Sequence, residues 1–187
     1  ALKAYSGASS AYYLNGNVAI GYQAAKGTTV SNSQSGMIAI GKKAMLSITG
    51  GQANTAIGNQ AGMLITTGER NVIVGYGALD NATTNADDNV VIGYNTMGGA
   101  IAAEVVDDCV AIGGDALAGA LDSTDGTDES SGTVARGRSA STALTSGARN
   151  TAVGYNALLV NSTGGYNTAV GETALDACTG GENTSSG

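Results

Sequence analysis

Hydrophobic and polar residues follow one another along this chain in a short motif that recurs almost to its end. The motif reads β-branched, small, β-branched, glycine, as in Val18-Ala19-Ile20-Gly21 and Thr151-Ala152-Val153-Gly154. Its glycine returns at spacings of 20, 17, 17, 18, 20, 24, 17, 17 and 16 residues. A period of this length predicts stacked structural repeats. The marker glycines are Gly21, Gly41, Gly58, Gly75, Gly93, Gly113, Gly137, Gly154, Gly171 and Gly187.

Two columns of mostly β-branched residues lie three positions and one position before each marker glycine. Residues two apart in an extended segment share a face, and β-branched side chains favour strands. We therefore expect a short strand in every repeat, with both columns filling the interior of a β-solenoid. The alanine between them would lie on the opposite face, where another chain could approach closely. The columns are Val18, Ile38, Thr55, Val72, Val90, Val110, Val134, Thr151 and Thr168, and Ile20, Ile40, Ile57, Val74, Ile92, Ile112, Arg136, Val153 and Val170.

Two further positions predict how successive coils are held together. Asparagine recurs four residues before the marker glycine, where stacked amides can form a ladder or occupy a left-handed corner. The marker glycine indicates a turn, or a close approach at which a Cβ would clash. The recurring asparagines are Asn17, Asn54, Asn71, Asn89, Asn150, Asn167 and Asn183.

The second half of the repeat predicts a shorter strand followed by a loop. Alanine recurs three residues after the glycine and is often followed by an apolar residue, as in Ala116-Leu117. The remaining residues are typical of turns and carry all the variation in repeat length, so they form the outward loop. The fold class is all-β, a β-solenoid or β-roll of about ten coils. Residues 17–187 form the array, and residues 1–16 form a degenerate first repeat or cap.

The composition of the chain predicts that several copies assemble. The chain has no Phe and no Trp with which to enlarge a single-chain core. Folding a short coil costs more conformational entropy than a few buried aliphatic side chains return, so further surface has to be buried. Packing of chains against one another through the alanine column is the simplest source, and we expect a homo-oligomer.

The repeats resemble those of two known families. Val18-Ala19-Ile20-Gly21, Ile38-Ala39-Ile40-Gly41 and Thr55-Ala56-Ile57-Gly58 are similar to the head repeats of trimeric autotransporter adhesins. The longer form from Asn150 to Gly165 resembles repeats of bacteriophage tail fibres. The resemblance covers residues 17–187 and implies an elongated homotrimer that attaches to a receptor or glycan on a host cell surface. It places the protein outside the cell, in a virion tail fibre or on a bacterial surface.

The same resemblance leaves three functions open. The repeat is longer than that of the autotransporter heads, and the chain shows neither their heptad stalk nor their membrane anchor, which favours a structural and adhesive segment of a tail fibre. The first alternative is the head of a bacterial surface adhesin or another extracellular filament. The second is a polysaccharide-degrading tail spike, which would use a pair of carboxylates.

Charge and residue content exclude several other classes. A net charge of −7 disfavours nucleic acid and anionic membranes as partners, and no apolar run is long enough for membrane insertion. The chain has no His, which removes His-based catalysis and metal sites. Cys109 and Cys178 are about four repeats apart, so an intrachain disulfide is not expected. We therefore predict a non-enzymatic protein with no catalytic, cofactor-binding or metal-binding residues.

A few motifs could still carry chemistry. Residues 36–43 nearly match a phosphate-binding loop, but Lys43 replaces the required Ser or Thr and the middle residues fall on a predicted strand. Residues 71–129 contain eleven acidic residues and no Lys or Arg. We interpret them as a solvated acidic belt, with oxygen-ligated Ca²⁺ as the alternative.

Two further positions carry predictions of their own. Arg136 is expected to turn outward at a local break or to pair with a carboxylate. Tyrosines after the marker glycine are expected to pack against a neighbouring chain, with glycan stacking as the alternative. They are Tyr22, Tyr76, Tyr94 and Tyr155.

Overall fold

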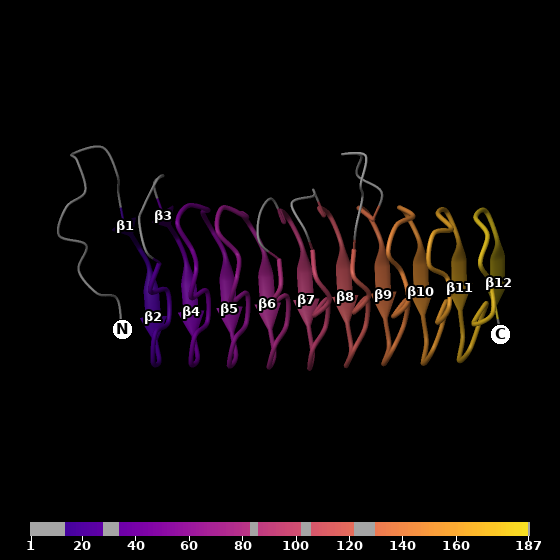
Figure 1. The fold of residues 1–187 in the computed structure, drawn as a ribbon, viewed down its shortest axis with the longest axis horizontal. Helices are drawn as coiled ribbons and strands as arrows, with labels where there is room; N and C mark the ends of the chain where they lie inside the picture. The colour runs from indigo at the N-terminus through magenta and orange to yellow at the C-terminus, as the bar shows by residue number, and fades with distance from the viewer. Residues whose placement is uncertain (1–13, 28–33, 83–85, 102–105, 122–129, 187) are drawn as a thin grey trace.

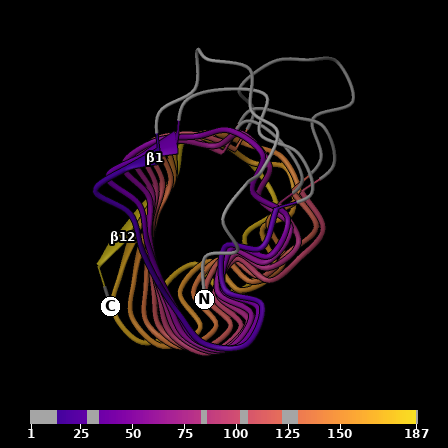
Figure 2. The same cartoon turned by 90° about the vertical axis from the view of Figure 1, so that its left-hand side faces the viewer.

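The computed structural model describes residues 14–27, 34–82, 86–101, 106–121 and 130–186. These residues form one stack of coils, and each coil contributes a short strand to a sheet that runs along the stack (Figure 1). Viewed along the stack, the coils superpose around a shared interior (Figure 2). The prediction of an all-β solenoid of short coils is therefore confirmed.

The main sheet contains ten parallel strands of three residues in the described part of the chain. Neighbouring strands pair in one register throughout, so that Ala39 lies beside Ala56 and Ile40 beside Ile57. A second, two-stranded sheet pairs β1 (Leu14–Asn15) with β3 (Gln34–Ser35). The strands of the main sheet are β2 (Val18–Ile20), β4 (Ile38–Ile40), β5 (Thr55–Ile57), β6 (Val72–Val74), β7 (Val90–Ile92), β8 (Val110–Ile112), β9 (Val134–Arg136), β10 (Thr151–Val153), β11 (Thr168–Val170) and β12 (Thr184–Ser186).

The marker glycine ends each strand because the neighbouring coil leaves no room for a side chain. Gly75 has a φ of 141°, and a Cβ built on it would collide with the carbonyl oxygen of Gly93 in the next coil. Gly58 and Gly154 stand in the same relation to the glycines that follow them. The predicted close approach of backbones is confirmed.

The segment after the marker glycine is a run of turns, so the prediction of a second strand is wrong. Lys43 and Met45, two and four residues after Gly41, have left-handed φ values of 58° and 49°. Their amides point along the stack: Lys43 N donates to Tyr22 O at 2.8 Å and Met45 N donates to Ala61 O at 2.9 Å. Hydrogen bonds between coils thus stabilise a conformation that these residue types rarely adopt alone.

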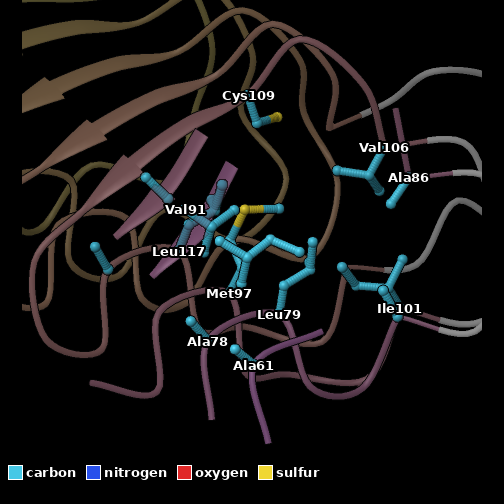
Figure 3. Close-up of a cluster of buried hydrophobic side chains, with 14 of the residues drawn as sticks. Ala61, Ala78, Leu79, Ala86, Val91, Met97, Ile101, Val106, Cys109 and Leu117 are labelled. Carbon is cyan, nitrogen blue, oxygen red and sulfur yellow. The ribbon is translucent and has the colours of Figure 1, made fainter. Parts of the chain in front are cut away.

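The alanines three residues after the marker glycines are buried, and three other positions of the repeat fill most of the interior. They are the middle residue of the strand, such as Val91, the residue four after the glycine, such as Met97, and an aliphatic residue of the following loop, such as Ile101 (Figure 3). The last two are bulky and reach across the coil, so a small residue usually suffices in the strand. The largest fully buried side chains are Met37, Met45, Ile48, Ile65, Ile73, Leu79, Met97, Ile101, Leu117, Leu121, Leu144 and Leu158.

Buried asparagines form the predicted amide ladder in two runs, Asn54-Asn71-Asn89 and Asn150-Asn167-Asn183. Within each run, the Oδ1 of one asparagine accepts from the backbone N and the Nδ2 of the asparagine in the next coil, at 2.9–3.1 Å. Cys109 and Thr133 occupy the same position between the two runs, and Cys109 N donates to Asn89 Oδ1 at 2.9 Å.

Two predictions fall outside the described residues. The predicted cap lies mostly in residues 1–13, and the longest insertion carries its acidic run in residues 122–129.

Candidate functional site: the outward face of the sheet

The outward face of the main sheet is lined by the two β-branched columns. Successive side chains of a strand point to opposite faces, so the first and third residues point outward when the middle one is buried. Val18 and Ile20 are 41% and 58% exposed, and Ile57 and Val72 are each 39% exposed. We call the first and third residues of β2 and of β4 to β12 the sheet face.

The prediction that these columns fill the interior is therefore wrong, and so is the predicted outward position of the alanines. Ala39, Ala56 and Ala152 are fully buried. The reason is steric, because bulky residues from the turn already occupy the interior. Where Ile73 replaces the alanine, the opposing position is Gly62, whose Cβ would lie 3.1 Å from Ile73 Cδ1.

Tyrosines extend the sheet face beyond the ends of its strands. Tyr22, Tyr76, Tyr94 and Tyr155 follow the marker glycines and are all exposed. The rings of Tyr76 and Tyr94 stack with centroids 5.6 Å apart and an interplanar angle of 13°. The tyrosines thus lie in one row along the stack, and their contacts with a second chain or with a glycan remain predictions.

Charged residues border the opposite edge of the sheet face, five residues before the marker glycine. Arg70 bonds both oxygens of Asp88 at 2.7 and 2.8 Å and also contacts Glu69. The Arg70 guanidinium holds the pKa of Asp88 below its usual range through this hydrogen bond. Further along the same edge, Arg149 donates to Tyr166 Oη at 2.7 Å and lies 5.5 Å from the ring centroid.

Arg136 points outward, as one of the two predictions for it required, but the sheet is not broken there. It is the exposed third residue of β9 and pairs in register with Ile112 and Val153. The whole column faces outward, so a charged residue is accommodated without a local break. The ion pairs found within the described ranges all involve Arg70, and Arg136 makes none of them.

Part of the acidic belt has a structural role that the sequence did not reveal. Asp87 Oδ1 accepts from Glu69 N at 2.8 Å, and Asp107 Oδ1 accepts from Asp87 N at 2.8 Å. The next coil continues this ladder, because Ser131 Oγ accepts from Asp107 N at 3.0 Å. The sequence signal for this ladder was a side chain with an acceptor oxygen that recurs six residues before the marker glycine. Among the residues whose placement is described, no cluster of His, Cys, Asp or Glu could hold a metal ion.

Two other sequence features have structural explanations. The segment resembling a phosphate-binding loop contains β4, so its central residues form a strand, as expected. Cys109 and Cys178 are both free. Burial raises the pKa of the Cys109 thiol to about 11, and its Sγ lies 3.3 Å from Ser130 O.

No protein-family model matches the chain, and neither a curated protein nor a solved structure matches it. Within the described residues, no helix is long and apolar enough to cross a membrane. The exposed sheet face is accordingly the feature on which a functional proposal has to rest.

Proposed function

We propose that this protein is a structural and adhesive segment of a homotrimeric extracellular fibre, of the kind found in bacteriophage tails, and that it is not an enzyme. The sheet face carries this proposal. Apart from Val160, every exposed large hydrophobic residue of the described chain lies on the sheet face or at one of two flanking positions. These positions are one residue after the marker glycine, as in Tyr22, and five residues before it, as in Tyr166. Hydrophobic side chains gathered on one face of a molecule mark an interaction surface.

The size of the sheet face supports association between copies. Ten strands about 4.8 Å apart, with roughly six residues between the two edges, give a face of about 43 by 20 Å. That is about 860 Å², close to the roughly 800 Å² that each partner contributes to a specific interface. A second copy of the same chain presents an equally long apolar face with the same repeat spacing.

Three copies fit the geometry, because the described part of each rod presents one such face. Three rods can turn their sheet faces toward a common axis and cover all of them in a closed assembly. The resemblance to trimeric adhesin heads and tail-fibre repeats favours the same number. The attachment role rests on that resemblance, and its partner is a receptor or glycan on a host cell.

The mass of the native particle tests the assembly. Each chain has a mass of 18.2 kDa, and native mass spectrometry at micromolar concentration should give three times that value. A particle of two chains would indicate face-to-face pairing, and a monomer at all concentrations would remove the basis of the proposal.

Binding to cells tests the attachment role separately. Fluorescently labelled protein should bind intact bacterial cells and should release no new reducing ends from their polysaccharides. Binding to animal cells alone would favour the bacterial adhesin head. Release of reducing ends would overturn the non-enzymatic assignment in favour of a tail spike.

A further inference from the structure

Both edges of the sheet face carry charged residues, and these residues lie in different coils. We call the residues five positions before the marker glycines the entry edge and those one position after them the exit edge. Charged and aromatic residues of the entry edge are Arg70, Asp88, Asp108, Arg149, Tyr166 and Glu182. Those of the exit edge are Tyr22, Lys42, Tyr76, Tyr94, Arg138, Tyr155 and Glu172. The acidic Asp88 and Asp108 therefore lie on one edge and the basic Arg138 lies on the other.

Symmetry decides which edges meet. Three parallel rods around a common axis form head-to-tail interfaces, so the exit edge of one copy lies against the entry edge of the next. The strands run across the stack (Figure 1), so residues of the same coil face one another across this seam. Adjacent coils are about 4.8 Å apart, which one arginine side chain can span.

We propose that Arg138 of one copy pairs with Asp108 of the next copy and stabilises the seam between aligned rods; the inference rests on the proposed homotrimer. In aligned copies, Arg138 of one copy faces Gly132 of the next copy. Gly132 is the entry-edge residue of the same coil and has no side chain. Asp108 is the entry-edge residue one coil earlier, about 4.8 Å away along the stack. Both residues are exposed in the single chain.

A second pair repeats the same geometry. Arg149 on the entry edge faces Tyr155 of its own coil, and Glu172 is the exit-edge residue one coil later. Arg149 pairs with Glu172 of the preceding copy while keeping its contact with Tyr166. In both pairs, the exit-edge residue belongs to the coil after that of its partner.

Sliding one copy by a coil changes which charges meet across the seam. A slide in one direction would set Arg138 against Arg149 and Glu172 against Glu182. Like charges brought together at an interface disfavour that arrangement. A slide in the other direction would set Arg138 directly against Asp108, and closure of three rods around one axis excludes that slide. Asp108, Arg138 and Glu172 make no ion pair within the chain, as far as the described ranges show, so their charges are available to a neighbouring copy.

Charge reversal tests the seam in the full chain. Arg138→Glu and Asp108→Arg should each raise the protein concentration at half assembly by about tenfold or more, because each sets like charges across the seam. The double variant restores opposite charges and should return this concentration to within about twofold of the unaltered chain. Asp176→Arg makes the same charge change at an exposed residue off both edges and should leave assembly unchanged.

The outcomes separate this inference from the proposed function. If the unaltered chain is monomeric, both fail. If it is trimeric and the single reversals assemble normally, or the double variant assembles no better than they do, the seam is wrong and the trimer stands. Circular dichroism of each variant checks folding. If a reversal misfolds, Arg138→Gln replaces it. We expect a smaller loss of assembly than for the reversal, and 1 M NaCl should abolish the difference from the unaltered chain. Unchanged assembly of Arg138→Gln would contradict the pair.

Discussion

At the scale of single residues, the marker glycine sets the distance between coils. Its φ of 128–144° in the described repeats is a conformation that other residues rarely adopt. Its Cα also faces the backbone of the next coil, so the requirement for glycine is both conformational and steric. This glycine could be predicted from the sequence because it recurs without exception at the end of every strand.

Alanine in place of Gly75 should therefore be severely destabilising. The added Cβ would meet the carbonyl of Gly93, and either coil would have to shift. We expect a loss of about 3 kcal/mol or more in the free energy of unfolding, measured with urea. Gly180→Ala is the matched control, because nothing lies within 4 Å of a Cβ at Gly180. Equal effects of the two substitutions would contradict the stacking.

The two cysteines should differ in reactivity. Cys109 is fully buried, and its pKa is raised to about 11 by that burial, so at pH 8 it is both inaccessible and protonated. Cys178 is partly exposed. A thiol reagent such as Ellman's should modify one thiol per chain in the native protein and two in guanidinium chloride. Rapid reaction of both native thiols would show that the interior is open.

The left-handed residues after the marker glycine could not be predicted from the sequence. Single-residue preferences assign this conformation to Gly, Asn and Asp, whereas Met45, Leu79 and Leu117 adopt it here. Their backbone is held by hydrogen bonds to the next coil and their side chains by the interior. Both causes lie in the stack and not in the local sequence.

Hydrogen bonds along the stack organise the structure at the scale of the coil. The asparagine ladder satisfies buried backbone amides and buried side-chain amides with the same oxygen atoms. An interior asparagine also supports the one after it, because Asn71 Oδ1 accepts two hydrogen bonds from Asn89. Its loss would therefore leave donors of a second coil without partners.

Replacing Asn71 with alanine should cost about 3–5 kcal/mol, since several buried polar groups would lose their partners. Asn183→Ala provides the comparison at the end of the ladder. Asn183 is only partly buried, so water can replace its contacts and we expect a cost of about 1 kcal/mol. Urea unfolding of both variants measures the difference, and an equal or reversed order would show that the ladder does not carry stability.

The strands of the main sheet could be located from the sequence, but their faces were predicted the wrong way round. Alternation fixes which residues share a face, and it does not say which face is inside when both are apolar. In the strand Val90-Val91-Ile92, all three residues are β-branched, and only the filled interior around Met97 decides the orientation. Apolar residues on both faces are typical of parallel sheets that are covered on both sides.

The whole molecule is a rod with one apolar side. Its interior is closed by its own turns, while the sheet face offers hydrophobic side chains along the length of the stack. Because the strand faces are the reverse of those predicted, we expect chains to contact one another through the valines and isoleucines and not through the alanines. The prediction of a partner chain is unchanged, because these larger side chains are the ones left exposed.

A charge placed on the sheet face should separate folding from assembly. Ile57 points away from the interior, so Ile57→Glu should leave the β-sheet circular dichroism unchanged while preventing association, because three carboxylates would be buried near the axis of the proposed trimer. Val160→Glu is the matched control, since Val160 has a similar exposure of 44% against 39% but lies off the sheet face.

Light scattering at equal concentrations should give the mass of one chain for Ile57→Glu and of three chains for Val160→Glu. An inward substitution, Ala56→Glu, should instead abolish folding, because it buries a charge in the closed interior. If Ile57→Glu assembled as well as Val160→Glu, the sheet face would not be the contact between copies. The apolar columns would then need a different partner of the same length and spacing.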